Sequence, residues 1–226
     1  SSSSGSAEVL EALGAHLALS PAQTGQGIDK LGLGFMFAPA YHAAMKHAAP
    51  VRKELGVRTL FNILGPLTNP AGTKHQVMGV FHPDLVGIQV RVLQRLGSKH
   101  VMVVYGLDGL DEISISGETL VGELVNGEIN EYRLHPSELG MELYDRRAIE
   151  VHTVDESKEM IMAVLGNQPG PARSIAVLNA GAAIYVSGIA RTYKAGIERA
   201  MHAIESGDAR RKLDEYVSFT QGMKSA

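Results

Sequence analysis

Two adjacent carboxylates follow a segment that should be a buried strand. Asp111 and Glu112 end the run Gly106-Leu107-Asp108-Gly109-Leu110-Asp111-Glu112, directly after the apolar residues 101–105. Ligands of open α/β sheets bind at the C-terminal ends of strands, and carboxylate oxygens supplemented by water suit Mg²⁺. The pattern therefore predicts a Mg²⁺ site, although a solvated acidic turn would have the same sequence.

A serine-rich segment precedes the first helical pattern. Ser1, Ser2 and Ser6 lie around Gly5, immediately before the run 7–13. Hydroxyl groups and free N–H groups at the start of a helix suit a phosphate or pyrophosphate group. The same serines are equally typical of a flexible linker.

Cationic side chains gather between Pro39 and the Gly65-Pro66 loop. They are His42, Lys46, His47, Arg52 and Arg58. This composition predicts a pocket for an anion such as a carboxylate, which an arginine binds through two parallel hydrogen bonds. The alternative is that the lysines lie on a solvated helix face and that the histidines are ordinary structural residues.

The elements that must position these residues alternate between strand and helix. Helices are predicted at 7–13, capped by Ser6, at 21–31, capped by Ser20, and at 39–46. A βαβ unit is predicted next: a strand at 76–81, a helix at 83–96 and a strand at 101–105. The helix carries Leu85, Ile88, Val92 and Leu96 on one side. Asn126-Gly127 predicts a hairpin. Helices at 156–165, capped by Asp155, at 172–185, at 190–204, and at 209–217, capped by Asp208, complete an α/β fold, with a frayed tail from Thr220.

Composition excludes several classes of protein. The 226 residues have a net charge of −3 and no cysteine, which argues against a disulfide scaffold, thiolate metal ligands and a basic nucleic-acid coat. The chain has no apolar run of bilayer length and no signal-peptide pattern. Glycine-rich dinucleotide, P-loop, serine-hydrolase and zincin motifs are also absent. We expect a cytoplasmic protein without membrane or nucleic-acid partners.

Together these residues resemble one enzyme family. The segments that carry the resemblance are Ser4-Gly5-Ser6-Ala7-Glu8, Gly34-Phe35-Met36-Phe37-Ala38-Pro39, Ala44-Met45-Lys46, Pro50-Val51-Arg52, Leu64-Gly65-Pro66-Leu67-Thr68-Asn69-Pro70 and Asp108-Gly109-Leu110-Asp111-Glu112. In combination they closely resemble anthranilate phosphoribosyltransferase, most strongly over residues 4–112.

The resemblance implies a fold and an activity. Residues 1–226 would form the large α/β domain of a nucleoside-phosphorylase and phosphoribosyltransferase-like fold, with a mixed, largely parallel sheet flanked by helices. The enzyme would transfer the phosphoribosyl group of phosphoribosyl pyrophosphate to anthranilate, with Mg²⁺, in tryptophan biosynthesis, and the complete enzyme would be a homodimer.

It also implies residue roles. Asp111 and Glu112 match the acidic pair that binds Mg²⁺, and Arg52 matches the arginine that meets the anthranilate carboxylate. The remaining matches are the lining of the anthranilate channel (Pro39, His42, Gly65 and Pro66) and the loop that binds the phosphoribosyl donor (Ser1, Ser2 and Ser6). No catalytic base is assigned.

The family pattern is not complete in this sequence. The Gly-Thr-Gly-Gly-Asp, Asn-x-Ser-Thr and Lys-His-Gly-Asn segments would precede Ser1, as would most of the helical domain. We therefore expect a C-terminal portion that shows no transfer alone and binds anthranilate weakly. Three other interpretations stay open: a pyrimidine nucleoside phosphorylase, a non-catalytic nucleic-acid binder, and a structural fragment without activity.

Overall fold

The computed structural model describes residues 5–41 and 63–224. The chain divides into two compact units. Unit 1 comprises Ser1–Leu60, Val151–Gly166 and Ser206–Ala226, and unit 2 comprises Phe61–Glu150 and Asn167–Glu205. The prediction of a single phosphoribosyltransferase domain over residues 1–226 stays a prediction.

Unit 1 is helical in its described part. Its helices are α1 (Ser6–Ala12), α2 (Pro21–Leu31), α3 (Ala38–Tyr41), α7 (Val154–Leu165) and α10 (Asp208–Met223). A small core forms where the buried Ala15, Leu17 and Tyr216 pack together. The Tyr216 hydroxyl also accepts a hydrogen bond from the Phe35 N–H at 3.2 Å, which ties the segment after α2 to α10.

The helices predicted at 7–13, 21–31, 156–165 and 209–217 are present, with corrections at their ends. Of the helix predicted at 39–46, residues 39–41 are helical and residues 42–46 lie outside the described residues. Gly5, Thr153 and Gly207 are the N-caps of α1, α7 and α10, where the sequence suggested Ser6, Asp155 and Asp208. The tail is helical to Met223 rather than frayed from Thr220. The Thr220 side chain is buried and its hydroxyl accepts a hydrogen bond from the His16 N–H at 3.0 Å, a contact that local sequence cannot reveal.

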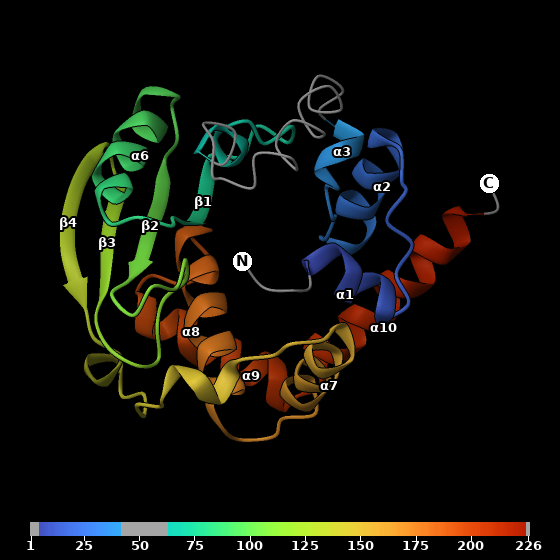
Figure 1. Ribbon diagram of the computed structural model, residues 1–226. Helices are drawn as coiled ribbons and strands as arrows, with labels where there is room; N and C mark the ends of the chain where they lie inside the picture. Colours follow the sequence, from blue (N-terminus) through green and yellow to red (C-terminus); the bar gives the residue numbers. More distant parts are fainter. Residues whose placement is uncertain (1–4, 42–62, 225–226) are drawn as a thin grey trace, which may run out of the picture. The chain divides into compact units, whose positions relative to one another are not determined.

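Unit 2 is built on a four-stranded sheet (Figure 1). Its strands, in both spatial and chain order, are β1 (His75–Gly79), β2 (His100–Gly106), β3 (Thr119–Val125) and β4 (Glu128–Leu134). β1 and β2 are parallel, as the predicted βαβ unit requires, and β2–β3 and β3–β4 are antiparallel.

The described sheet is therefore mixed, as predicted, but not largely parallel. The twelve residues between β2 and β3 contain no crossover helix, and β3 turns directly into β4. Asn126 and Gly127 form this turn with φ of 53° and 84°, the left-handed pair that favours a tight hairpin. Both connections return the chain in the opposite direction, which makes the neighbouring strands antiparallel.

Helices cover both faces of the sheet (Figure 1). α6 (Asp84–Arg95) packs on the face that carries Val101, Val103 and Leu124. α8 (Pro171–Val186) contacts the opposite face, where the ring of Tyr185 meets that of His100 at 4.6 Å. α9 (Tyr193–Glu205) packs against α8. Within the described residues, short 3₁₀ helices lie in connections at Gly65–Leu67, Pro136–Leu139 and Arg146–Ile149.

The buried side of α6 differs from the apolar stripe that the sequence suggested. Ile88 and Leu96 are 54% and 52% exposed, while Val86 and Val90 are buried. A Cβ atom at Gly122 of β3 would lie 3.1 Å from a methyl carbon of each valine. Because Gly122 leaves this space free, the side of the helix that carries Val86 and Val90 fits against the sheet, and Ile88 and Leu96 lie outward.

Candidate functional site

The acidic segment begins with a tight turn at the end of β2. The Gly106 N–H donates to the Leu110 carbonyl at 2.8 Å, and the Leu107 N–H donates to the Glu118 carbonyl at 2.9 Å. These backbone bonds close the segment on itself before it reaches Asp111. The structure therefore places the acidic pair beside the C-terminal end of a buried strand, as the sequence predicted.

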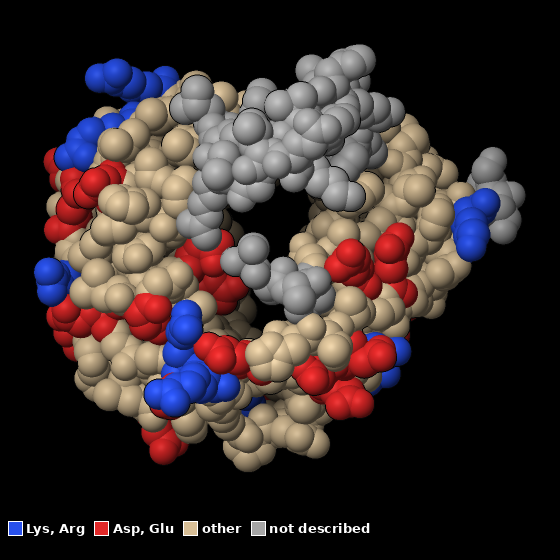
Figure 2. All heavy atoms as spheres, viewed as in Figure 1, with Lys and Arg blue, Asp and Glu red and all other residues tan. Residues whose placement is uncertain are grey.

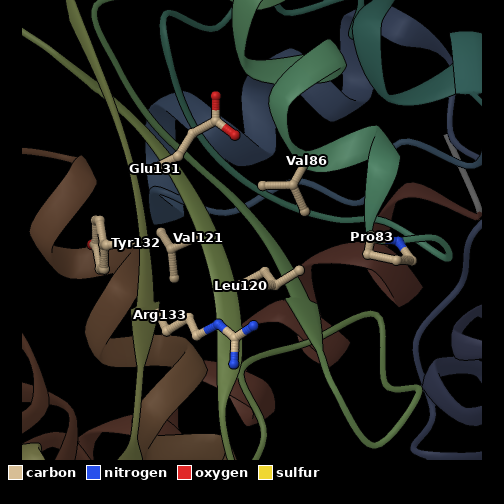
Figure 3. A pocket seen from close by; sticks show the side chains of 7 residues that line it. All are labelled: Pro83, Val86, Leu120, Val121, Glu131, Tyr132 and Arg133. Atoms are coloured by element: carbon tan, nitrogen blue, oxygen red, sulfur yellow. The ribbon is translucent and has the colours of Figure 1, made fainter.

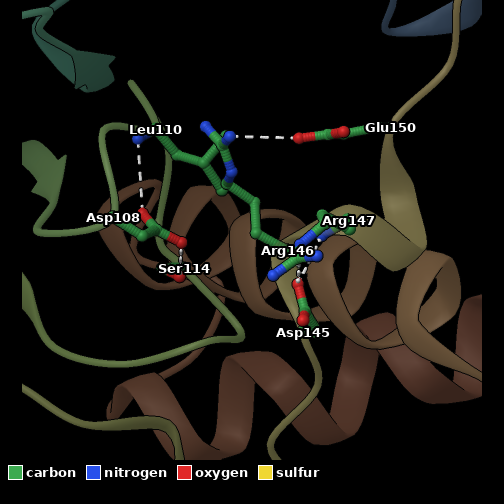
Figure 4. A network of polar contacts seen from close by, with 7 residues as sticks. All are labelled: Asp108, Leu110, Ser114, Asp145, Arg146, Arg147 and Glu150. Atoms are coloured by element: carbon green, nitrogen blue, oxygen red, sulfur yellow. Dashed lines mark hydrogen bonds and ion pairs between the residues drawn. The ribbon is translucent and has the colours of Figure 1, made fainter.

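Asp108 belongs to the framework of this turn (Figure 4). One of its carboxylate oxygens accepts a hydrogen bond from the Ser114 hydroxyl at 2.6 Å, and the other accepts from the Leu110 N–H at 3.3 Å. Ser114 is fully buried. Since both oxygens are used to hold the loop, Asp108 has a structural role and differs in this from the two acids that follow.

The last residue of β1 fixes the loop on its other side. A Cβ atom at Gly79 would overlap the carbonyl oxygen of Asp111. Only glycine permits this close approach of two backbone segments. Gly79 therefore determines how near the acidic pair lies to the end of β1, and nothing in the local sequence had marked it as part of the site.

Asn179 of α8 holds the residue that follows the pair. Its Oδ1 accepts a hydrogen bond from the Ile113 N–H at 2.9 Å, and its Nδ2 donates to the Ile113 carbonyl at 3.0 Å. The Ile113 side chain is buried. Sequence reasoning missed Asn179, whose signal was a lone amide in the apolar helical run 175–186.

The carboxylates of Asp111 and Glu112 have a different environment. Both residues are exposed, and within residues 5–41 and 63–224 neither side chain has a hydrogen-bond or ion-pair partner. Partial removal of the Glu112 carboxyl from water, together with the neighbouring charge of Asp111, raises the pKa of Glu112 above its usual value. Two adjacent, unpaired and mutually repelling carboxylates favour a divalent cation, which would relieve the repulsion.

Asp111 and Glu112 would supply two carboxylate ligands to the cation. No group of three or more His, Cys, Asp or Glu side chains in that part of the chain could enclose a metal ion. This donor set fits Mg²⁺, which keeps several waters and is bound through one or two carboxylates plus substrate phosphates.

Gly65 and Pro66 lie at the other end of β1. The Pro66 carbonyl accepts a hydrogen bond from the Gln76 side chain at 3.0 Å, whereas Asp111 approaches Gly79. These two attachment points are three residues apart along the strand, or roughly 10 Å. The Gly65-Pro66 loop and the acidic loop thus both contact β1, but at different residues, Gln76 and Gly79.

The remaining predicted site residues divide between unit 1 and the undescribed segments. Ser6 is exposed in the first turn of α1, and Pro39 lies in α3. Ser1, Ser2, His42 and Arg52 lie outside the described residues. Their predicted roles stay predictions.

Several basic side chains on the surface of unit 2 are paired with acidic ones. On the face in Figure 2, acidic and basic side chains of the described residues are interspersed, without a continuous basic patch. Arg91 pairs with Glu131, Arg133 with Glu118, and Arg146 with Glu150 (the last in Figure 4). No helix in the described part of the chain is long and apolar enough to span a bilayer.

A pocket of about 260 Å³ lies between the start of α6 and the sheet (Figure 3). Figure 3 shows Glu131 and Arg133 on the side of Val86 and Pro83, with Tyr132 on the other side of the strand. Both charged residues already have the partners named above. The charged residues that line the pocket are therefore paired, and none of the lining residues belongs to the segment 106–112.

Comparison with known proteins identifies the family. A model of the glycosyl transferase family, a/b domain, matches residues 1–210. The chain belongs to this family. Two curated relatives, from Leptothrix cholodnii and Dechloromonas aromatica, are each named anthranilate phosphoribosyltransferase. They are 59% and 61% identical over 226 and 221 residues, which are 100% and 98% of this chain. The resemblance identified from the sequence is thereby confirmed.

Solved structures of the same family support the fold. Anthranilate phosphoribosyltransferase from Thermus thermophilus is 41% identical with a TM-score of 0.88, over 96% of this chain and 64% of that one. The enzyme from Saccharomyces cerevisiae, in complex with PRPP and Mg, is 25% identical with a TM-score of 0.86, over 96% and 63%. The chain spans about two thirds of its curated relatives, 66% and 65% for the two named above.

Proposed function

We propose that the protein to which these residues belong transfers the phosphoribosyl group of phosphoribosyl pyrophosphate to anthranilate, giving phosphoribosyl-anthranilate and pyrophosphate. The observation that carries the proposal is the unpartnered Asp111–Glu112 pair at the end of β2, within the described part of the chain. It occurs in a chain 59% identical to a protein named for this reaction. The reaction would be a step of tryptophan biosynthesis.

The reaction exchanges one bond at the anomeric carbon for another. The anthranilate nitrogen forms the new C–N bond with its lone pair, the C–O bond to pyrophosphate breaks with its electrons on oxygen, and the nitrogen then releases a proton. Positive charge develops on the sugar and negative charge on the leaving group. An aromatic amine needs little activation, so the proposal requires no strong general base among the residues of this chain.

Asp111 and Glu112 would hold Mg²⁺, which supplies charge neutralisation for a pyrophosphate leaving group. The pair's own task is to place two carboxylates at a fixed position beside β1. Gly79 and the Gly106–Leu110 turn provide that position in the described structure. The yeast relative in complex with PRPP and Mg supports this assignment.

The substrate contacts are proposed from the family pattern. Arg52 would bind the anthranilate carboxylate and so direct the amine toward the anomeric carbon. Pro39, His42, Gly65 and Pro66 would line the anthranilate channel, and Ser1, Ser2 and Ser6 would contact the phosphoribosyl donor. We further propose that the complete enzyme is a cytoplasmic homodimer.

The direct test is an assay of the full-length protein that contains this sequence. Anthranilate fluorescence is followed with phosphoribosyl pyrophosphate and Mg²⁺, and product pyrophosphate is measured in parallel. The proposal predicts equal consumption of anthranilate and release of pyrophosphate, both abolished by removing Mg²⁺ with a chelator. Phosphorolysis of pyrimidine nucleosides in place of anthranilate consumption would contradict it.

A further inference from the structure

We propose that Asn179 is a positioning residue for the acidic pair: its double hydrogen bond to Ile113 sets the direction in which Asp111 and Glu112 present their carboxylates to a divalent cation. The proposal rests on the proposed function, because it concerns the same pair. It adds a residue 67 positions later in the chain than Glu112, on a different element.

The Asn179 side-chain amide bonds to both backbone groups of Ile113, as the backbone of a neighbouring β-strand would. The Ile113 N–H and carbonyl are bonded to the amide of Asn179 at 2.9 and 3.0 Å. Because the N–H requires an acceptor and the carbonyl requires a donor, this contact fixes the orientation of the amide. Its Nδ2 also donates to the Ile175 carbonyl one turn earlier at 3.0 Å, which restrains the side chain against its own helix.

Helix formation does not account for an asparagine at this position. Asparagine is less favourable than alanine or leucine in a helix interior. Its neighbours Val177, Leu178 and Ala182 are buried and apolar. The contact with Ile113 is the feature of the fold that requires an amide here, since an apolar side chain would leave the Ile113 backbone groups without this partner.

The bond to the Ile113 N–H acts on Glu112 through a rigid group. That N–H belongs to the same planar peptide unit as the Glu112 carbonyl. Fixing the plane therefore restrains the ψ angle of Glu112. Burial of the Ile113 side chain restrains where the chain lies, but it does not by itself determine how the preceding peptide is rotated.

The pair is consequently restrained from both sides. Before it, the Gly106 N–H holds the Leu110 carbonyl, and the close approach of Gly79 limits the position of Asp111. After it, Asn179 holds Ile113. Without Asn179, the buried Ile113 side chain and the hydrogen bond from the Ser114 N–H to the Thr119 hydroxyl at 3.0 Å would still hold the chain after the pair. The peptide between Glu112 and Ile113 would lose the contact that fixes its rotation, and the two carboxylates would sample a wider range of directions.

The test measures cation binding directly, in the full-length protein. Binding of Mn²⁺ in the presence of inorganic pyrophosphate is followed by the electron paramagnetic resonance signal of free Mn²⁺. Removing a side chain that orients a metal ligand typically weakens metal affinity about 10- to 100-fold. We expect Asn179→Ala to raise the Mn²⁺ dissociation constant, and the Mg²⁺ concentration for half-maximal turnover, by about this factor, with the KM for anthranilate unchanged.

Tyr193→Phe is the matched control. It removes a hydrogen bond to the same helix one residue away, from the Tyr193 hydroxyl to the Leu178 carbonyl at 3.0 Å. This bond has no part in holding the loop. We expect the control to lower thermal stability while leaving the Mn²⁺ dissociation constant unchanged. An equal rise in both variants would overturn the assignment, since it would reflect only weakened packing of α8.

A second variant covers the case in which Asn179→Ala does not fold. Asn179→Gln keeps a neutral amide with the same donor and acceptor. The side chain is longer by one methylene, so the amide no longer lies opposite the Ile113 backbone groups. It should also raise the Mn²⁺ dissociation constant. A folded variant of either kind that binds Mn²⁺ as the wild type does would overturn the proposal.

The same experiment separates this inference from the proposed function. Asp111→Asn with Glu112→Gln should abolish the Mn²⁺ binding that depends on the pair. If it does so while the Asn179 variants bind normally, only the role of Asn179 is refuted. If the wild type and the acid variant bind Mn²⁺ equally, the proposed metal site fails and the inference fails with it.

Discussion

Asp108, Asp111 and Glu112 are three acids within five residues, and their surroundings assign them different roles. Asp108 accepts hydrogen bonds from Ser114 and Leu110, which hold the turn together. Asp111 and Glu112 are exposed and have no such partners among the described residues. A carboxylate that stabilises a loop is expected to be paired, whereas carboxylates kept for a cation are left unpaired at a cost in repulsion.

The acidic pair gives the first prediction. In the full-length enzyme, Asp111→Asn with Glu112→Gln should lower Mg²⁺-dependent turnover by more than about 100-fold, because a bound metal contributes several kcal/mol to transition-state stabilisation and about 1.4 kcal/mol is a factor of ten. Turnover is measured across a Mg²⁺ titration. Wild-type activity of this variant at low Mg²⁺ would reduce the pair to a solvated turn.

The stability of that variant has a predictable pH dependence. The pKa of Glu112 is raised in the folded state, so its ionised form disfavours folding at pH values above that pKa. The variant should therefore unfold at an equal or higher temperature than the wild type at about pH 7. The difference should shrink as the pH falls through the pKa of Glu112, as measured by calorimetry without Mg²⁺. A variant less stable than the wild type at neutral pH would show that the pair supports the fold.

Arg52 gives a prediction that separates the two substrates. If it binds the anthranilate carboxylate, Arg52→Ala removes a charge-assisted hydrogen bond worth about 1.5–3 kcal/mol. The KM for anthranilate should rise by one to two orders of magnitude, at about 1.4 kcal/mol for each factor of ten. The KM for phosphoribosyl pyrophosphate should change much less. Steady-state kinetics with each substrate varied in turn would decide, and an equal change in both constants would contradict the role.

At the scale of elements, glycines determine how closely the layers approach. α8 and α9 cross at Gly181 and Gly196, where a Cβ atom on Gly196 would overlap the Gly181 carbonyl oxygen. A Cβ atom on Gly181 would lie 2.8 Å from the Ile197 nitrogen. The close crossing brings the Tyr193 hydroxyl within 3.0 Å of the Leu178 carbonyl. It thereby fixes how closely α9 packs on α8.

The same substitution should have opposite effects at two helical glycines. Gly196→Ala should destabilise the protein by about 1–3 kcal/mol or more, because the added methyl group forces α8 and α9 apart. Gly25→Ala, in the interior of α2 with no atom within 4 Å of the new Cβ, should stabilise it by roughly 0.5–1 kcal/mol through helix propensity. Urea unfolding of both variants tests the two predictions, and a Gly196→Ala variant as stable as the wild type would contradict the close crossing.

Across the whole chain, the charges argue against a nucleic-acid partner. The net charge is −3, and the basic residues of unit 2 named above are paired with acids. Electrostatic binding to phosphates needs unpaired cations and weakens steeply with salt. We expect titration with single-stranded nucleic acid at about 50 and 200 mM salt to give no salt-dependent binding. Micromolar binding at the lower salt concentration that weakens at the higher one would instead favour the non-catalytic interpretation.

The sequence by itself determined the elements and the location of the acidic pair. Local signals were sufficient for this: the Ser20 cap and Gly32 delimit α2, Asn126-Gly127 closes the hairpin, and the apolar run before Gly106 becomes β2. Each of these depends on backbone propensity or on contacts between near neighbours. The family resemblance likewise rests on short contiguous segments, which a single chain displays in full.

Only the tertiary structure decided which residues hold the pair in place. Gly79 and Asn179 are 32 and 68 positions from Asp111, and they act through a close backbone approach and a double hydrogen bond. The side of α6 that is buried also depends on a distant residue, because Gly122 of β3 leaves space for it. Likewise, the bond from the His16 N–H to the Thr220 hydroxyl holds the C-terminal part of α10. Contacts between residues far apart in the chain leave no periodic signal in the sequence, because each depends on where another element packs.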